Sequence, residues 1–293
     1  MAKTWRIGDV TVTKIVELEH VTADTGLWPL ATPEALLSHA WLRPHFVTDK
    51  AELKISIHAL VVETPTRRII VDTCVGNDKQ RTLMPVWHEL QTPFLEDLAA
   101  AGFPRESIDA VVCTHLHLDH VGWNTMLVNG KWIPTFPNAR YLMGRREYDH
   151  WHSEVEQAQL SGPIGDIQAG AMQDSVKPVF DAGLVDLVET DHRICEEVSL
   201  IPTVGHTPGH VSVEIVSKGE RALITGDFIH HPCQFAHPDW YSSADYDTAQ
   251  STRTRREVFG ALAGTPTLVI GTHFAGPTTG HIVHDGEAYR LDV

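Results

Sequence analysis

The sequence lacks the features that mark secreted, membrane-spanning or disulfide-rich proteins. No stretch approaches the roughly 18 consecutive apolar residues of a transmembrane helix, and the N-terminus shows no apolar core of a secretory signal. The sequence has only four cysteines, Cys74, Cys113, Cys195 and Cys233. They lie far apart without a CxxC pair, which predicts free thiols in a reducing compartment. These absences predict a cytoplasmic protein with no membrane partner.

Basic side chains are also scarce. The chain has 23 Lys and Arg against 38 Asp and Glu, and its formal net charge is −15. A nucleic-acid partner is therefore not expected, because phosphate binding needs a basic surface. By contrast, the sequence contains 19 histidines, an unusually high number beside its 23 basic residues. This composition directs attention to the histidines as candidate functional residues.

Apolar runs separated by turn residues predict strands alternating with helices, as in an α/β fold. The expected strands are residues 5–7, 10–16, 55–62, 68–72, 109–114, 139–143, 185–188, 198–202, 211–216, 221–225 and 267–270. The expected helices are residues 93–101, 145–160 and 246–262, and residues 162–178 are expected to be irregular. No linker and no repeat interrupts this pattern. We therefore expect a single domain over residues 1–293.

Residues 19–50 lose the periodicity of the flanking strands. We expect a long, loop-rich N-terminal segment, which in a compact domain has a function or is mobile. Its aromatic residues either cover a pocket, form a subunit interface in a homodimer, or pack onto the domain. Aromatic candidates for a substrate pocket are Trp28, Phe46, Trp87, Trp123, Phe235 and Trp240. The loop at residues 231–241 is the expected pocket wall.

Four metal-competent side chains fall within six positions, directly after the apolar strand 109–114. They are His115, His117, Asp119 and His120. Alternate residues of an extended segment point the same way, so His115 and His117 can reach one ion together. Asp119 and His120 follow where the chain must turn, and can serve a second ion. Imidazole and carboxylate ligands suit zinc. A lone histidine is more often a surface or hydrogen-bonded core residue, but this spacing favours a metal site.

Three further candidates each follow a predicted strand and stand next to a glycine. His206 follows strand 198–202, Asp227 follows strand 221–225, and His273 follows strand 267–270. With the first cluster they make five histidines and two carboxylates, about the number that two ions sharing a water require. Asp72, at the end of another strand, is either a supporting carboxylate or a turn residue.

The order HxHxDH, GHTPGH, a strand-end GD and GTH resembles the metallo-β-lactamase-fold hydrolase superfamily. The resemblance runs from about residue 55 to 280 and implies a four-layer αβ/βα sandwich. It implies two zinc ions per chain, although other divalent metals remain open. The first ion would be held by His115, His117 and His206, and the second by Asp119, His120 and His273. Asp227 would bridge the two, and His210 would support the ligands.

Within that superfamily the sequence looks most similar to the N-acyl-homoserine lactonases and the methyl parathion hydrolases. Many of these lactonases carry a tyrosine shortly after the bridging Asp, where it contacts the substrate carbonyl. This chain departs from that pattern and has His230 three residues after Asp227. His230 either takes the role of the tyrosine or packs beside the site.

A two-metal site lowers the pKa of bound water towards about 7, so a hydroxide nucleophile is available at neutral pH. The expected function is therefore a dinuclear zinc hydrolase that opens a small ester-like substrate, most specifically a lactone. Asp119, Asp227 and His230 are the expected catalytic residues. Hydrolysis of a phosphotriester or aryl ester in the same pocket is the first alternative. The second is a non-catalytic metal-binding or sensor protein.

Overall fold

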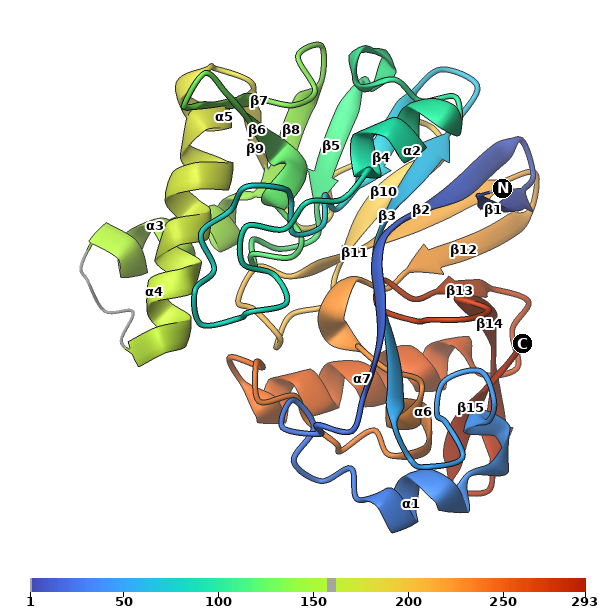
Figure 1. The fold of residues 1–293 in the computed structure, drawn as a ribbon. Coiled ribbons are helices and arrows are strands. Elements are labelled where there is room, and N and C mark those ends of the chain that lie inside the picture. The colour runs from blue at the N-terminus through green and yellow to red at the C-terminus, as the bar shows by residue number, and fades with distance from the viewer. Residues whose placement is uncertain (1, 157–161) are drawn as a thin grey trace. The chain divides into compact units, whose positions relative to one another are not determined.

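The computed structural model describes residues 2–156 and 162–293, which divide into two compact units (Figure 1). Unit 1 consists of Met1–Glu17 and Ile57–Thr190, and unit 2 of Leu18–Ser56 and Asp191–Val293. The expectation of a single domain over residues 1–293 stays a prediction.

A seven-stranded sheet, in the order β1-β2-β3-β4-β5-β8-β9, dominates the described part of unit 1. Its strands are β1 (Lys3–Ile7), β2 (Val10–Thr22), β3 (Leu53–Glu63), β4 (Arg68–Val71), β5 (Ala110–Cys113), β8 (Arg140–Gly144) and β9 (Val185–Val188). The β4, β5, β8 and β9 strands run parallel. All four residues of β5 are buried, as expected of a central parallel strand covered on both faces.

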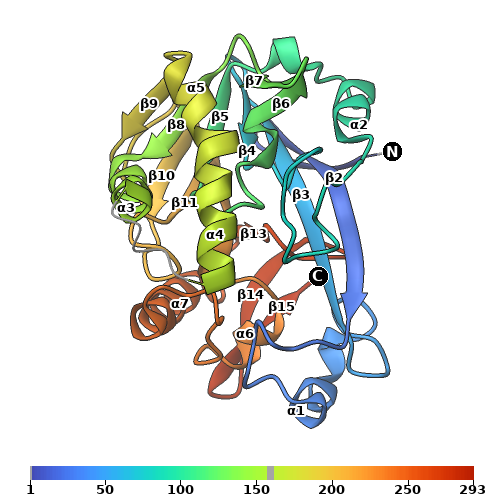
Figure 2. The same ribbon diagram turned by 60° about the vertical axis from the view of Figure 1, so that its left-hand side comes forward.

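Helices and one hairpin complete unit 1. They are α2 (Phe94–Ala100), α3 (Arg145–Glu156), α4 (Gly162–Ala171), α5 (Lys177–Asp181), the 3₁₀ turns η2 (Arg105–Ser107) and η3 (Gly122–Asn124), the π-helical turn η4 (Met172–Val176), and the hairpin β6 (Thr125–Val128) and β7 (Lys131–Pro134). Figure 2 shows α5 above α4, with α3 to the left of α4. The prediction of an irregular stretch at residues 162–178 was wrong. Residues 157–160 of the predicted helix 145–160 lie outside the described residues.

Unit 2 is built on a second sheet, which has six strands in its described part, in the order β10-β11-β12-β13-β14-β15. The strands are β10 (Val198–Pro202), β11 (Val211–Ser217), β12 (Glu220–Ile224), β13 (Leu268–Ile270), β14 (Thr279–Asp285) and β15 (Ala288–Asp292). Only the β12–β13 pair is parallel among these neighbours. The chain leaves β10, β12 and β13 at the positions that carry the predicted ligands of this unit.

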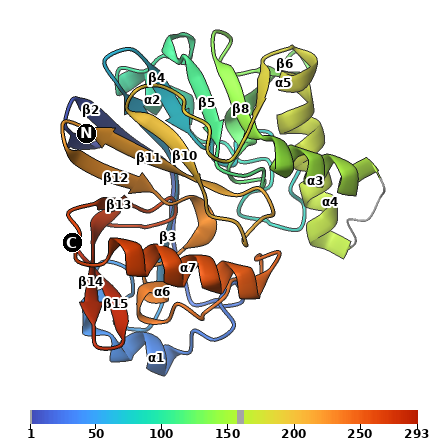
Figure 3. The same ribbon diagram turned by 180° about the vertical axis from the view of Figure 1, so that it is seen from behind.

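The helices of unit 2 are α1 (Pro33–Ser38), α6 (Cys233–Ala236), α7 (Thr248–Leu262), η1 (Ala40–Leu42) and η5 (Gly226–Phe228). Figure 3 shows α7, in orange, running past α6 and the β14–β15 hairpin. Asp247 caps α7 by accepting a hydrogen bond from the Gln250 backbone N–H, and Phe259 and Leu262 bury its inner face. Among the described residues, no helix has both the length and the apolar character that crossing a membrane requires.

The segment predicted to be loop-rich, residues 19–50, is partly structured. β2 continues to Thr22, so the predicted strand 10–16 was too short, and α1 and η1 lie further along. Trp28 and Phe46 from this segment are 1% and 0% exposed and belong to the core of unit 2. Burial of these large side chains stabilises the packing of the segment on its own unit. Each Å² of apolar surface removed from water contributes about 25 cal/mol to that stability.

Candidate metal centre

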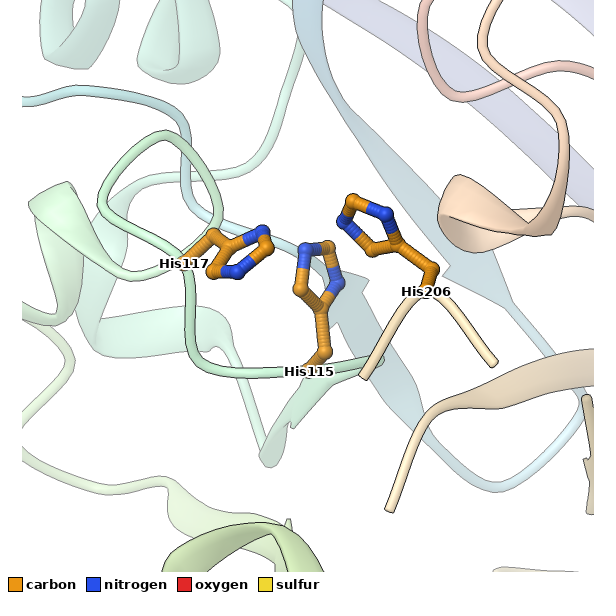
Figure 4. A group of neighbouring side chains, drawn as sticks. All are labelled: His115, His117 and His206. Carbon is orange, nitrogen blue, oxygen red and sulfur yellow. The ribbon is translucent and has the colours of Figure 1, made fainter. Parts of the chain in front are cut away.

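The first group of predicted ligands lies in unit 1, on the turn that follows β5. His115 and His117 are two residues apart, and their rings meet edge to face with centroids 4.6 Å apart. The ring of His120 lies 4.1 Å from that of His115. Figure 4 shows His115 and His117 on this turn, and it also draws His206, which belongs to unit 2. Three predicted ligands of one turn are therefore neighbours.

Asp72, at the end of β4, fixes this turn. Its Oδ1 accepts the backbone N–H of Thr114 at 2.8 Å, and its Oδ2 accepts the Thr114 hydroxyl at 2.9 Å. The same Oδ2 lies 2.9 Å from Nδ1 of His120. The Nδ1–H of His120 thus donates to Asp72, while Nε2 lies on the side of Asp119, whose Oδ2 is 3.8 Å away. Asp72 touches a predicted ligand, as a supporting carboxylate does.

Gly122 follows the HxHxDH motif, and its lack of a side chain allows the backbone at Cys74 and Val75 to approach closely. The Gly122 N–H donates to the Cys74 carbonyl at 2.8 Å, and a Cβ on Gly122 would lie only 1.8 Å from the Val75 carbonyl oxygen. Glu17 completes the support by accepting from the Val75 N–H and from Trp123 Nε1–H. Burial raises the pKa of Glu17 to about 7. Sequence reasoning missed Glu17, because a single carboxylate in a strand carries no motif.

The peptide between His115 and His117 is held from both sides. Glu147 in α3 accepts the Leu116 N–H at 3.2 Å, and Gln168 in α4 donates to the Leu116 carbonyl at 2.6 Å. Glu147 also accepts from Trp151 Nε1–H at 2.6 Å, and the Trp151 ring lies 5.4 Å from the ring of His117. These contacts were not predicted, and the Gln168 contact falls in the stretch expected to be irregular.

The predicted ligands of unit 2 gather around one carboxylate. Asp227 lies in η5, directly after β12, and is 3% exposed. Its Oδ2 is 3.2 Å from Nε2 of His273 and 3.7 Å from Nε2 of His206. Nε2 of His230 is 3.3 Å from the same oxygen. Three loops that follow separate strands thus bring three imidazoles to a single oxygen atom.

His206 and His273 are each oriented by an oxygen atom near Nδ1. His206 Nδ1 lies 3.0 Å from Oδ1 of Asp245, and His273 Nδ1 lies 3.1 Å from the Ser56 carbonyl oxygen. Burial lowers the pKa of His206 to about 4, so its ring is neutral at pH 7. Burial raises the pKa of Asp245, but the hydrogen bond from His206 and the charge of the nearby Arg255 guanidinium help to hold it below its usual range. Asp245 had no sequence signal and was missed.

The second histidine of GHTPGH supports Asp227 rather than standing beside it as a ligand. The backbone N–H of Asp227 donates to Nε2 of His210 at 2.7 Å, and Nδ1 of His210 lies 2.9 Å from the Thr203 hydroxyl oxygen. A Cβ on Gly226 would lie 2.6 Å from His210 Nε2, and Gly226 has a φ of +57°. Only glycine suits this position.

His230 lies next to the predicted ligands of unit 2. One candidate ligand atom each of His206, His230 and Asp245 lie within 4.8 Å of one another. The ring of His230 meets that of His206 edge to face at 4.7 Å and that of Trp28 at 6.2 Å. It is 4% exposed, and its Nδ1 is buried without a hydrogen-bond partner. His230 therefore has one polar atom available for a ligand.

Each unit taken alone offers a donor set that suits zinc. Neutral imidazole nitrogen and carboxylate oxygen are zinc ligands, and the second ring nitrogen of such histidines commonly donates to an oxygen. His115, His120, His206 and His273 each have an oxygen near Nδ1, which leaves Nε2 as the ring nitrogen that could bind a metal. The residues present therefore fit a divalent metal ion.

The aromatic residues predicted to line a pocket are mostly core. Trp28, Phe46, Phe235 and Trp240 pack in one cluster of unit 2, and Trp123 stacks on Phe94 in unit 1. Residues 231–235 of the expected pocket wall are buried as well. Alternating position does not reveal whether an aromatic faces a cavity or a core, so the sequence could not distinguish these roles.

Comparison with protein families gives one match over most of the chain. The model of the Metallo-beta-lactamase superfamily matches residues 55–273. Among relatives, an N-acyl homoserine lactonase from a Bacillus species is 24% identical over 216 residues, covering 69% of this chain and 76% of the relative.

Solved structures agree with this match. AidC, a dizinc quorum-quenching lactonase solved with the product N-hexnoyl-L-homoserine, superposes with a TM-score of 0.79 at 20% identity, covering 99% of this chain and 96% of that one. The hydrolase AbOPH, of the beta lactamase superfamily, gives 0.81 at 24% identity, covering 100% and 97%. The fold class predicted from the sequence is confirmed.

Proposed function

The chain belongs to the metallo-β-lactamase superfamily and is a metal-dependent hydrolase of the lactonase type, and we propose that it is a dinuclear zinc enzyme that opens a lactone ring. Its relative acts, by name, on N-acyl homoserine lactones, and a structural neighbour is a dizinc lactonase. The substrate, the zinc and the number of ions are proposals for this chain. A reducing, cytoplasmic setting is proposed too, supported by its four free cysteines.

The proposed metal ligands are those that the sequence singled out. They are His115, His117, Asp119, His120, His206, Asp227 and His273. The observation that carries the proposal is the orientation of the histidines: Nδ1 of four of them faces an oxygen, which directs Nε2 to a metal. His210 and His281 also have an oxygen near Nδ1. What sets His206 and His273 apart is that their Nε2 atoms converge on one Asp227 oxygen. Bound zinc would supply Lewis acidity and a water that ionises near pH 7.

The protein groups then have separate tasks. Asp119 would orient the attacking water and accept its proton, a role supported by its partly exposed carboxylate beside His120. Asp227, whose Oδ2 faces three imidazoles, would hold metal together with His206 and His273 and is the carboxylate that we propose would be shared by two ions. His230 donates a hydrogen bond to the carbonyl oxygen, whose charge grows as the tetrahedral centre forms. When the ring C–O bond breaks, the leaving alkoxide takes up the proton that Asp119 accepted from the water, and the product is a hydroxy acid.

A substrate panel on zinc-loaded protein tests this proposal. We expect turnover of N-acyl homoserine lactones above that of aryl esters, phosphotriesters, thioesters and β-lactams, and two zinc ions per chain by elemental analysis. Turnover of phosphotriesters alone would assign the site to the first alternative. Two bound ions without turnover of any substrate would indicate a metal-binding or sensor protein.

A further inference from the structure

Two histidines outside the candidate centre meet in unit 2. His39 follows α1, and His237 follows α6, 198 residues further along the chain. Their Nε2 atoms lie 2.9 Å apart, and their rings meet edge to face with centroids 4.9 Å apart. Both side chains are half-buried. Neither belongs to the ligand set of the proposed enzyme, so this pair needs its own explanation.

The positions of both rings are set by their surroundings. The ring of His237 stacks on Trp240 with centroids 3.9 Å apart and planes 7° apart, and its backbone N–H donates to the Cys233 carbonyl. His39 ends a helix whose start is capped by the Thr32 side chain. Two imidazoles on fixed backbone points lose little freedom when they bind a common ligand, which favours binding.

The charge state of the pair also suits a cation. Burial lowers the pKa of His39, although the charge of Asp285 opposes this. Burial and the neighbouring His39 lower the pKa of His237, and the charge of Asp239 opposes this. Both rings are therefore neutral at pH 7, and neutral imidazole is the form that binds metals. The two carboxylates add negative potential around the pair.

We propose that His39 and His237 form an accessory site for a divalent transition-metal ion such as Ni²⁺ or Cu²⁺, which takes the place of the proton between the two Nε2 atoms while that proton moves to Nδ1 of the ring that carried it. Two nitrogens about 2.0–2.1 Å from an ion, at a right angle, lie about 2.9 Å apart. This is the separation found here. Right-angled positions belong to the square-planar and octahedral geometries that Cu²⁺ and Ni²⁺ favour. Water completes the remaining positions, because both rings reach the surface.

An ion at this site would tie two segments together. One is the segment formed by residues 23–50, which carries His39 and also packs Trp28 against His230. The other runs from α6 to Trp240, whose carbonyl accepts from Gln234 Nε2 at 2.8 Å. Oε1 of Gln234 in turn accepts the backbone N–H of His230 at 2.9 Å. The accessory ion therefore stiffens the backbone that carries His230 without touching the candidate centre.

Titration of the zinc-loaded protein with Ni²⁺ tests the site. Elemental analysis after equilibration at pH 7.5 is expected to find one Ni²⁺ per chain beyond an unchanged zinc content. His39→Gln and His237→Gln should each lose this equivalent. His45→Gln, an exposed histidine of the same segment, should keep it. Equal Ni²⁺ content in wild type and both variants, or none in wild type, would show that the contact is only a hydrogen bond.

A second readout guards against a variant that folds poorly. Electron paramagnetic resonance of one equivalent of Cu²⁺ should show two coordinated imidazole nitrogens in wild type and one in His39→Gln. Far-UV circular dichroism and the zinc content check that the variant is folded. A spectrum unchanged by His39→Gln would place the copper elsewhere and overturn the proposal. None of these results depends on lactone turnover, so they are independent of the proposed function.

Discussion

The two units hold their predicted ligands in different ways. In unit 1, four ligands sit on six consecutive residues, and the supporting side chains hold the backbone of that turn as well as its rings. In unit 2, three ligands come from three separate loops, and each is fixed by its own long-range partner. One backbone turn is rigid as a whole, whereas three loops depend on side chains. Substitution of a supporting residue in unit 2 should therefore disturb a single ligand, whereas substitution of one in unit 1 should disturb several ligands together.

The sharpest test of this comparison sets Asp227 against Asp72. Asp227→Ala removes the carboxylate that three imidazoles face, and we expect it to lower kcat/KM by at least about 10³-fold with loss of zinc. Asp72→Ala removes a supporting carboxylate, for which losses are typically about 10–100-fold. Steady-state kinetics and elemental analysis of both purified variants measure the difference. Equal losses would mean that Asp227 is not a ligand.

His230 tests whether unit 2 also supplies a catalytic donor. His230→Ala should lower kcat by about 10²–10³-fold while both zinc ions stay bound, because one hydrogen bond to the developing oxyanion is lost. His230→Tyr should restore part of the loss for lactones, since a phenol also donates. The matched control is His231→Gln, whose ring is buried and faces the Phe46 carbonyl instead. Wild-type turnover in His230→Ala would place the donor elsewhere.

Buried titratable groups give the two units opposite pH dependence. His231 in unit 2 accepts the Cys233 N–H at Nδ1, so it is held neutral, and burial lowers its pKa to about 4. The contribution of neutral His231 to the free energy of unfolding is complete above the unfolded pKa of about 6.5. As pH falls towards 4, this contribution, on the order of 3 kcal/mol, is lost. Glu17 in unit 1 has its pKa raised to about 7. The contribution of protonated Glu17 to the free energy of unfolding is complete below about pH 4.5 and is lost as pH rises through 7.

Urea unfolding of wild type and each variant at pH 4, 4.5, 6.5 and 7 separates these two effects. The free energy of unfolding of His231→Gln should fall less than that of wild type between pH 6.5 and 4. Glu17→Gln should instead flatten the loss between pH 4.5 and 7. If neither variant changes the slope in metal-free protein, both groups keep their ordinary pKa values in the folded protein and the prediction is wrong.

The contrast between the units also explains what the sequence could predict. HxHxDH is local, so its geometry follows from the strand before it and the turn within it. His206, Asp227 and His273 were found only because each follows an apolar strand beside a glycine. Their partners Asp245 and Ser56 are set by tertiary packing and leave no pattern. Residues 162–178 were expected to be irregular because glycines outweighed a helical pattern that packing stabilises.

The smallest expected effect compares one supporting carboxylate from each unit. Asp245 contacts a ligand ring, so Asp245→Asn can turn its amide to present N–H to His206 Nδ1, which disfavours the tautomer with Nε2 directed to zinc. We expect zinc affinity to fall by about 10–100-fold. Glu147 contacts the Leu116 backbone N–H, and Glu147→Gln keeps an acceptor oxygen there, so less than about a 10-fold loss is expected. Competition with a chelator, at fixed pH, measures both affinities. If Glu147→Gln weakens zinc as much as Asp245→Asn does, the charge of Glu147 rather than its hold on the backbone supports the turn, and the two units are alike in this respect.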